Sequence, residues 1–344
     1  MSGTKIRSYD IVEQSDVIEF KKTGKYKIKS YLGEGSFGEV YKVQKMEENN
    51  SENSKIFALK IFKKYQAQKY PNSENSRPNE ILNLEIKELS TLNMVKRINN
   101  PYLMKYVDWK IHGKTKEIMV LMEYLDFDLN TFFYQNIGRN EVINETFFKN
   151  IVFQMLSALN ALHKNGIIHC DIKPQNILYK SKENIIQIID YGLSQRISFD
   201  VKKDYKATGG TFPYMAPDIL LGNTLFFKSW DIWSLGCVLV ELCTGKVLFP
   251  GNSYKEVLEK IVDIFGSIKE LLPGFEFLAQ KRKVILSERE GKGLINFIKE
   301  NQKFKFLNDD FYDLVNSMLC IDPTKRISAE EAMKHSWLKN IIPL

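Results

Sequence analysis

The chain has little cysteine, and none of it is arranged in pairs. Its 344 residues include four cysteines, no two of which form a C-x-x-C pair: Cys170, Cys237, Cys243 and Cys320. Neither a zinc site nor a disulfide framework is therefore indicated. Because unpaired cysteines are typical of reducing compartments, we expect a cytoplasmic protein, with the nucleus as the alternative.

Long apolar runs are also lacking. The longest, Ile232–Cys243, is interrupted by Ser234 and Glu241, and it predicts a buried helix instead of a membrane span. The first five residues lead into no apolar stretch, and position 2 is not glycine, so neither a secretion signal nor myristoylation is indicated. We expect no insertion into a membrane.

Charge of one sign is not concentrated anywhere. The net charge is +7, but the lysines are scattered among asparagine and glutamate, which is typical of a solvated surface. Nucleic-acid binding would need a basic stripe with interleaved aromatic residues, so we expect no nucleic-acid partner. Apolar residues make up 44% and charged residues 26%, the composition of a soluble globular protein.

The first part of the chain has the pattern of strands. Residues 1–24 are polar and predict a loose arm. An amphipathic helix is predicted over Ile81–Val95, where apolar residues recur at helical spacing. Five strands are predicted around it, namely Lys27–Leu32, Glu39–Val43, Ile56–Phe62, Leu103–Trp109 and Glu117–Met122.

After Asp128 the period changes to that of helices. The predicted helices are Glu145–Lys164, Trp230–Cys243, Tyr254–Phe265, Asp310–Leu319 and Ala329–Leu338. This order predicts an α+β fold with two lobes. A small β-rich lobe with one main helix covers residues 25–123, a hinge covers 123–128, a mainly helical lobe covers 129–338, and a short tail covers 339–344.

A glycine-rich segment lies between the first two predicted strands. In Gly33-Glu34-Gly35-Ser36-Phe37-Gly38, the glycines permit a hairpin to lie close over phosphates and to direct N–H groups at them. Dinucleotide-binding folds use similar letters, but their loop runs into a helix. Here a strand pattern follows, so we predict a nucleotide-covering hairpin, with an ordinary glycine turn as the alternative.

Lys60 lies in an apolar strand, on the face that it shares with Ala58. A buried ammonium group needs anionic partners, which phosphate oxygens and a helix carboxylate would supply. We prefer Glu85 as that carboxylate because apolar residues follow it at helical offsets. Glu88, three residues on, lies near the same face and stays open, as does the reading that either glutamate is simply an exposed charge.

Four polar residues in the second part complete a set suited to phosphoryl transfer. Asp171 can accept the proton of an attacking hydroxyl group, and Lys173 can neutralise charge on the transferred group. Asn176 and Asp190 offer hard oxygen ligands that suit Mg²⁺. Each residue alone is weak support, but the ordered set is typical of one reaction.

In this order the motifs resemble those of eukaryotic protein kinases, from Tyr26 to Leu338. The likeness includes the segments Gly210–Asp218 and Asp231–Gly236 and, later, Arg326. It implies transfer of the γ-phosphoryl group of ATP, with Mg²⁺, to hydroxyl groups of protein substrates. Lys173 and Thr211 resemble the serine/threonine type, with Thr211 on the substrate side. A regulatory partner is not identified.

The resemblance also implies roles for single residues. Met122 would be the gatekeeper, Asp128 would reach the ribose, Asp231 would brace the catalytic loop, and Arg326 would pair with Asp218. The nucleotide would contact Leu32, Gly33, Glu34, Gly35, Ser36, Phe37, Gly38, Val40, Ala58, Lys60, Met122, Glu123, Leu125, Asp128 and Leu178.

The subgroup resembled is CMGC, nearest the DYRK type, through Ile167–Asp171 and Leu248–Gly251, although Met215 departs from it. Most kinases carry an arginine where Cys170 stands, and that arginine holds a phosphorylated activation segment. Cysteine offers no such charge, so we predict activity without phosphorylation of Tyr205 or Thr208. The alternatives are a pseudokinase, which the complete charged set disfavours, and a dual-specificity kinase with tyrosine autophosphorylation.

Overall fold

The computed structural model describes residues 17–35, 38–46, 55–62, 79–113, 115, 117–136, 143–197, 209–223, 227–339 and 341, apart from the side chains of residues 79–86 and 227. The predictions for Ser36, Phe37, Tyr205 and Thr208, and for the side chain of Glu85, fall outside these residues. Within the described part, every helix is too short or too polar to cross a membrane.

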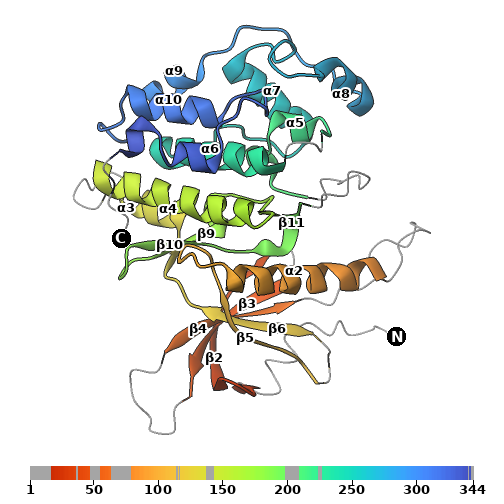
Figure 1. Cartoon of the computed structure of the whole chain (residues 1–344), viewed down its shortest axis with the longest axis vertical. Coiled ribbons are helices and arrows are strands. Elements are labelled where there is room, and N and C mark those ends of the chain that lie inside the picture. Colours follow the sequence, from red (N-terminus) through yellow and green to blue (C-terminus); the bar gives the residue numbers. More distant parts are fainter. Residues whose placement is uncertain are drawn as a thin grey trace, which may run out of the picture. The chain divides into compact units, whose positions relative to one another are not determined.

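The chain divides into two compact units (Figure 1). The first contains the residues up to Arg97 together with Met104–Leu125, and the second contains Ile98–Leu103 and the chain from Asp126 onward. The chain passes from the first unit to the second between Leu125 and Asp126. This point lies within residues 123–128, for which the sequence predicts a hinge. The fold is α+β, with a strand-rich first unit and a mainly helical second unit.

The first unit is built on a six-stranded sheet in the order β1-β2-β3-β4-β6-β5, in which all neighbours are antiparallel. Its strands are β1 (Val17–Phe20), β2 (Gly24–Gly35), β3 (Gly38–Lys45), β4 (Ile56–Phe62), β5 (Tyr106–Ile111) and β6 (Ile118–Glu123). Alternate residues of these strands point into one apolar core, as the strand period of two requires.

The predicted loose arm over residues 1–24 is wrong at its end. Val17–Phe20 forms β1 and pairs with the start of β2, and Ile18 and Phe20 are buried in the sheet core. Phe20 packs edge-on against Tyr26, with ring centroids 5.8 Å apart. Burial of two large apolar side chains stabilises this edge strand, although the polar residues around it hide its pattern.

The glycine-rich segment is a hairpin between two strands, as predicted. Gly35 at the end of β2 opposes Gly38 at the start of β3 in the antiparallel register. A Cβ atom on Gly38 would lie only 2.3 Å from the carbonyl oxygen of Ile61 on β4. Glycine is therefore required at Gly38 by the close approach of β4, which brings the hairpin against the strand that carries Lys60.

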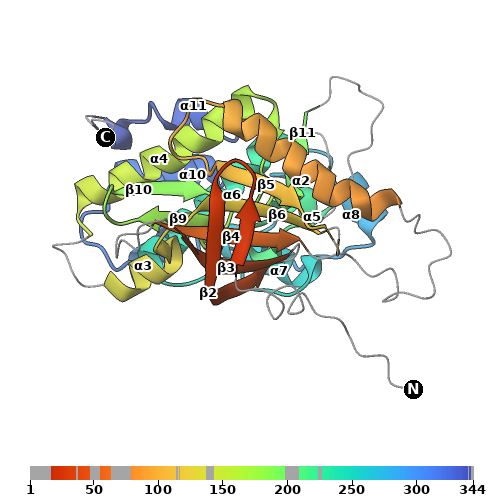
Figure 2. The same ribbon diagram turned by 90° about the horizontal axis from the view of Figure 1, so that it is seen from below.

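One long helix, α2 (Asn79–Arg97), lies beside this sheet in Figures 1 and 2. It extends two residues beyond the predicted range at each end. Leu92 and Val95 are buried, and Asn93 accepts a hydrogen bond from the Tyr106 hydroxyl of β5 at 2.7 Å. These contacts fix the helix face from which Glu88 projects.

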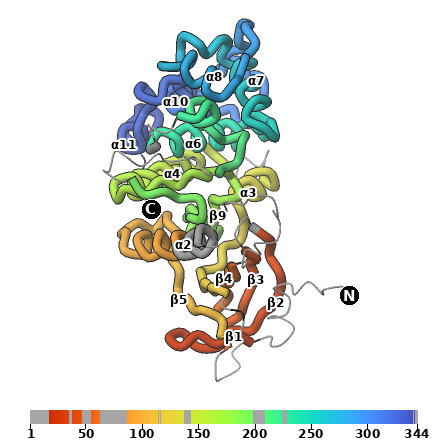
Figure 3. The backbone as a smooth tube through the Cα atoms, turned by 90° about the vertical axis from the view of Figure 1, so that its right-hand side faces the viewer, coloured from red at the N-terminus to blue at the C-terminus, as the bar shows by residue number. Residues whose placement is uncertain are grey.

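The second unit is layered around α6 (Phe227–Thr244). Nearly every described residue of this helix is buried, as expected for a helix that is apolar on all sides. Gly236 lets α10 approach closely, since a Cβ atom there would meet Leu319 at 2.9 Å. The surrounding helices, seen together in Figure 3, include α4 (Glu145–Lys164), α7 (Tyr254–Phe265), α10 (Asp309–Met318) and α11 (Ala329–Ala332).

Two small sheets of the second unit hold the loop that carries Asp171. The first orders β10 (Ile185–Ile188), β9 (Ile177–Lys180) and β7 (Phe127–Asp128), and the second pairs β11 (Gln195–Arg196) with β8 (Ile167–Ile168). Residues 169–176 therefore run from β8 to β9. We call them the Asp171 loop.

The sequence pattern misses several short elements. Leu103 is not in a strand of the first unit but bridges to Ile188 in the second, so β5 starts three residues later than predicted. The predicted helix Ala329–Leu338 is two elements, α11 and a 3₁₀ turn at Ser336–Leu338, because His335 caps the second one. Four short helices were not predicted, namely α3 (Leu129–Asn136), α5 (Pro217–Leu220), α8 (Phe275–Arg282) and α9 (Leu294–Asn301).

Candidate active site

In the first unit, Lys60 forms a buried ion pair with a carboxylate of α2. Its Nζ lies 2.7 Å from Glu88 Oε1, and the two residues are only 7% and 2% exposed. The prediction preferred Glu85, and the described partner is instead Glu88, the alternative one turn further along the helix. Residues three apart share a helix face, which is why spacing alone did not separate them.

The predicted nucleotide contacts of the first unit lie on one face of the sheet. Val40 opposes Lys60 in the β3–β4 register, and Ala58 opposes Met122 in the β4–β6 register. Cross-strand partners point to the same side, and Ala58 and Lys60 are two residues apart on one strand. Gly33 opposes Val40 from β2. The backbone thus gathers these predicted residues on the face that carries the ion pair.

Other predicted contacts lie at the edges of the units. Glu123 ends β6, opposite Phe57, and Leu125 is buried. In the second unit, Asp128 of β7 opposes Leu178 of β9. The carboxylate of Asp128 accepts hydrogen bonds from the backbone N–H and hydroxyl of Thr131, at 3.0 and 2.5 Å, so it caps α3.

A buried carboxylate of α6 anchors the Asp171 loop. Asp231 accepts the backbone N–H of His169 on one oxygen and that of Cys170 on the other, each at 2.9 Å. His163 Nε2 lies 2.8 Å from Asp231 Oδ2. Burial alone would raise the pKa of Asp231, but hydrogen bonding and charge interaction with His163, together with His169, bring that pKa below its ordinary value.

The two hydrogen bonds to Asp231 hold a turn that few residues adopt. Cys170 has φ of 67°, in the left-handed region, which costs a non-glycine residue about 1 kcal/mol or more. His169 adds support, because its Nε2 lies 2.8 Å from the carbonyl oxygen of Ile189. The backbone is thereby turned so that Asp171 begins a cluster of polar contacts.

In that cluster, both oxygens of Asp171 are engaged. Oδ1 accepts the hydroxyl of Thr211 at 2.8 Å and its backbone N–H at 3.1 Å. Oδ2 lies 2.8 Å from Lys173 Nζ and accepts Asn176 Nδ2 at 3.0 Å. Lys173 also donates to the Thr211 hydroxyl at 2.9 Å. One hydrogen-bonded site, which we call the Asp171 cluster, therefore joins Thr211 to three residues of a single predicted motif, Asp171, Lys173 and Asn176.

Asn176 and Asp190 are placed by the same backbone. The Asn176 amide donates to Asp171 through Nδ2, so its oxygen is the acceptor that remains, and no described side chain donates to it. Asp190 has φ of 63° and precedes the 3₁₀ turn Tyr191–Leu193. The Ile189 N–H donates to the Asn176 carbonyl at 2.9 Å, which ties the segment that carries Asp190 to the Asp171 loop.

Asp218 and Arg326 form a second buried ion pair, far from each other in sequence. The Arg326 guanidinium lies 3.3 Å from Asp218 Oδ1, and neither side chain is exposed to solvent. Burial raises the pKa of Asp218 and lowers that of Arg326, although each charge favours the other. Arg326 also donates to the carbonyl groups of Ser229 and Cys320, which fixes the helix start that carries Asp231.

Two supporting contacts were not predicted from the sequence. His163 lies in the last turn of α4 and is buried there, which local sequence does not reveal. Tyr214 donates to Glu241 of α6 at 2.7 Å, and burial raises the pKa of both groups. In the sequence, the only sign of this contact was that Glu241 interrupts an apolar run.

Comparison with known proteins agrees with this geometry. Residues 26–338 match the family model described as "Protein kinase domain". The chain is 29% identical over 332 residues to cyclin-dependent kinase G1 of Arabidopsis thaliana, with 94% of this chain and 50% of that protein covered. It is 30% identical over 317 residues to cyclin-dependent kinase B2-1 of the same plant, with 90% and 92% covered.

A further relative is cyclin-dependent kinase 11 of Dictyostelium discoideum, 30% identical over 311 residues, with 89% of this chain and 78% of that protein covered. These relatives belong to the CMGC group, in agreement with the subgroup that the motifs resemble. The finer likeness to the DYRK type stays a prediction. Identities near 30% agree with a divergent member.

The Lys60–Glu88 pair gives the first testable prediction. Glu88→Gln removes the charge opposite a buried ammonium group, and we expect the free energy of unfolding to fall by about 3 kcal/mol. Urea unfolding of purified protein measures this, with Glu85→Gln on the same helix as the control. A loss from Glu85→Gln as large as that from Glu88→Gln would contradict the assignment.

The Asp231 anchor gives a prediction with a defined pH dependence. Asp231→Asn replaces an acceptor of two N–H groups by an amide, and we expect a loss of about 3 kcal/mol in the free energy of unfolding at pH 7. Because the folded-state pKa of Asp231 is depressed, its stabilisation is complete above the ordinary carboxylate pKa of about 3.9 and is lost as the pH falls through the folded-state pKa.

The stability difference between the wild type and the Asp231→Asn variant should therefore stay constant from pH 7 to about pH 4.5 and narrow below it. Urea unfolding at a series of pH values tests this. If the stability difference instead narrowed as the pH rose, the depressed pKa of Asp231 would not be the source of the stabilisation.

Proposed function

Because the chain belongs to the protein kinase domain family, we propose that it transfers the γ-phosphoryl group of ATP to serine and threonine hydroxyl groups of proteins, with Mg²⁺ as the metal. The kinase class follows from the family and its relatives, and the residue roles below are our assignment. Protein substrates are the partners we propose. The relatives' names state dependence on cyclins, and from them we propose only that a second protein regulates this enzyme.

The contact that carries the proposal is the hydrogen bond from the Thr211 hydroxyl to Asp171 Oδ1, at 2.8 Å. An acceptor serine or threonine presents the same aliphatic hydroxyl group to a carboxylate. In our assignment Asp171 orients this hydroxyl and takes its proton as the phosphoryl group is transferred. Thr211 then occupies the substrate side of the carboxylate, as the resemblance implies.

Lys173 supplies the positive charge of this site. Its ammonium group is held 2.8 Å from Asp171 Oδ2 and 2.9 Å from the Thr211 hydroxyl oxygen. Because both anchors are fixed, the charge needs little reorganisation as negative charge develops on the transferred oxygens. Lys60, held by Glu88 on the first unit, is our assignment for the phosphates of ATP.

The donor set fits a hard divalent cation. Asn176 turns its amide oxygen away from Asp171, and Asp190 adds a carboxylate on a segment tied to the same loop. Neutral and anionic oxygen ligands with few protein contacts are typical of Mg²⁺ bound together with phosphates. When bound, the metal would neutralise phosphate charge. The residues' own part is to fix two oxygen ligands beside the carboxylate that handles the proton.

Activity without a phosphorylated activation segment is also part of the proposal. Cys170 stands where an arginine would hold the phosphate, and Gln195 is another neutral residue nearby. The left-handed turn at Cys170 is instead held by Asp231. The turn thus has a support that needs no phosphate. We place the enzyme in the cytoplasm or the nucleus, since none of the four cysteines forms a disulfide.

The kinase assignment is tested by Asp171→Asn. With ATP, Mg²⁺ and a generic protein acceptor, we expect kcat to fall by about 10²–10⁴-fold, because the hydroxyl proton loses its acceptor. Asp309→Asn is the control, since its side chain is 99% exposed. Phosphoamino-acid analysis of the product should give phosphoserine and phosphothreonine. Equal activity of both variants would refute the assignment, and phosphotyrosine would favour dual specificity.

The independence from phosphorylation is tested by a double variant, Tyr205→Phe with Thr208→Ala. We expect its kcat to stay within about threefold of the wild-type value, or roughly 0.7 kcal/mol of activation free energy. Steady-state assays of phosphatase-treated enzyme measure this. Loss of nearly all activity in the double variant would reject this part of the proposal while leaving the kinase assignment intact.

A further inference from the structure

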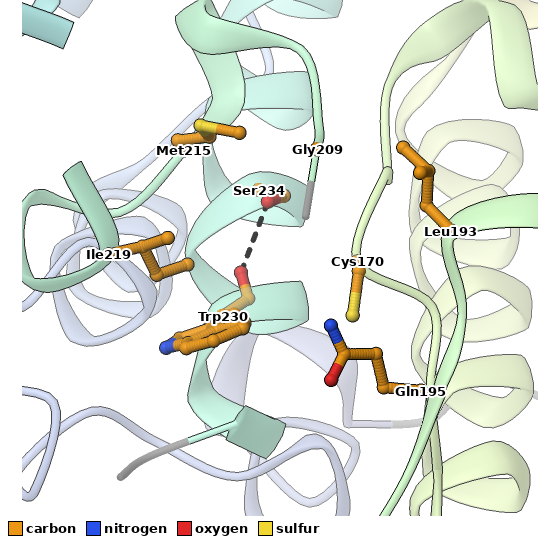
Figure 4. Close-up of a pocket in the computed structure, with 8 residues that line it drawn as sticks. All are labelled: Cys170, Leu193, Gln195, Gly209, Met215, Ile219, Trp230 and Ser234. Carbon is orange, nitrogen blue, oxygen red and sulfur yellow. Dashed lines mark hydrogen bonds between the residues drawn. The ribbon is translucent and has the colours of Figure 1, made fainter. Parts of the chain in front are cut away.

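The pocket beside Cys170 in the second unit is too small and too neutral to hold a nucleotide. Eight residues line it, and none of them is charged (Figure 4). It has room for about one water molecule, and the Ser234 hydroxyl already donates to the Trp230 carbonyl group at 3.1 Å. The nucleotide contacts that we propose lie instead on the sheet face of the first unit that carries Lys60.

Lys42 of β3 belongs to this face. It opposes Ala58 of β4, and Ala58 opposes Met122 of β6, so the three residues form one cross-strand row. Residues in such a row point to the same side of a sheet. In the next row on this face, Val40 opposes Lys60. Lys42 is therefore a neighbour of the predicted nucleotide contacts, although the sequence did not assign it a role.

The side chain of Lys42 contacts a residue beyond the end of β6. Its Nζ lies 4.5 Å from the centroid of the Tyr124 ring. Strands β3 and β6 are both neighbours of β4, so their backbones are about 10 Å apart, and the two side chains meet across β4. Ala58, the cross-strand partner of Lys42, leaves room for this contact because its side chain is a single methyl group.

Tyr124 lies between two predicted nucleotide contacts, Glu123 and Leu125. Because β6 ends at Glu123, the strand ladder does not hold the chain at Tyr124. Leu125 is buried, but no hydrogen bond holds Tyr124 in the part of the chain that the structure describes. The contact with Lys42 therefore ties this segment, with which the first unit ends, to β3.

The charge of Lys42 is available for this contact. Among the described residues, no carboxylate forms an ion pair with its ammonium group. The face of a tyrosine ring is negatively polarised and attracts a cation that lies within about 6 Å of the ring centroid. Lys42 and Tyr124 are both partly buried, which lessens the screening of their attraction by salt.

We propose that the cation–π pair of Lys42 and Tyr124 positions the segment Glu123–Leu125 for the nucleotide, which makes Lys42 a positioning residue for nucleotide binding. This inference rests on the proposed function, because the nucleotide is the ATP of that reaction. The pair joins β3, the second strand of the glycine hairpin, to the end of the first unit. Two sets of predicted nucleotide contacts are thus fixed relative to each other before ATP binds, so less free energy is lost on ordering them.

Isothermal titration calorimetry of the full chain with ATP and Mg²⁺ tests this role. We expect Lys42→Met and Tyr124→Leu each to raise the Kd by about threefold, the size typical of a cation–π pair at a partly exposed site. Lys42→Arg and Tyr124→Phe keep the cation and the ring, so their Kd should stay within about 1.5-fold of the wild-type value. Lys27→Met is the matched control, since Lys27 is exposed on the same face, opposite Gln44.

The double variant distinguishes a pair from two independent effects. Lys42→Met combined with Tyr124→Leu should bind ATP no more weakly than either single variant, because each substitution alone already removes the contact. If the two losses multiply, or if the single variants bind like the wild type, the inference is overturned and the proposed function still stands on the wild type's own binding. A wild type that binds no ATP would refute both.

A second measurement needs no nucleotide. Urea unfolding of the wild type, both single variants and the double variant gives the unfolding equilibrium constant of each. In the double variant, we expect this constant to be about threefold smaller than the two single effects multiplied together predict. Effects that multiply fully would show that the two side chains do not act as a pair, and would overturn the inference.

Steady-state assays separate binding from the transfer step. In Lys42→Met, the KM for ATP should rise by about threefold while kcat stays within about 1.5-fold of the wild-type value, because the pair acts on the bound position of the nucleotide. A fall in kcat with an unchanged KM would instead assign Lys42 to another step and overturn its role in nucleotide binding.

Discussion

The second unit depends on one buried carboxylate that accepts two consecutive backbone N–H groups. Burial of the charged Asp231 carboxylate away from water would by itself cost free energy. Its contacts with His163 and with the two N–H groups offset that cost. What this arrangement provides is geometry. It holds Cys170 in a backbone conformation that it would rarely adopt, immediately before Asp171.

The contacts of Asp171 show why such a fixed support is useful. A carboxylate with the role proposed for Asp171 has to be presented at hydrogen-bonding distance, and its donors in the cluster are all held between 2.8 and 3.1 Å. Because the backbone, a lysine and an amide hold it from three sides, little reorganisation remains for the reaction itself.

The strands and the long helices follow closely from the sequence, because their apolar periods of two and 3.6 extend over many residues. The glycine hairpin was predicted for the same reason, since strand patterns flank it on both sides. β1 was missed because four residues inside a polar stretch give too short a period. Short helices such as α3 are harder to predict, because its buried residues Leu129, Phe132 and Phe133 span little more than one turn. Its start depends on a local cap, the carboxylate of Asp128.

For the site, the sequence predicted which residues come together better than which atoms meet. Lys173 and Asn176 come from the same motif as Asp171, whereas Thr211 comes from a later segment. Their convergence on Asp171 is set by β8, β9 and the α6 anchor. The choice of Glu88 could not be made from spacing, because Glu85 lies on the same helix face. The support from His163 requires knowledge of which helices pack together, and local sequence does not contain that.

The pairing of Asp218 with Arg326 spans 108 residues of chain. During synthesis on the ribosome, the segment with Asp218 emerges long before Arg326. Until Arg326 emerges, the Asp218 carboxylate and the neighbouring Trp230 lack the guanidinium group that packs against them. The strand-rich unit ends at Leu125, so it does not depend on a partner from the end of the chain. Vectorial translation therefore makes the residues of the first unit, including the Lys60–Glu88 pair, available before Arg326 can pair with Asp218.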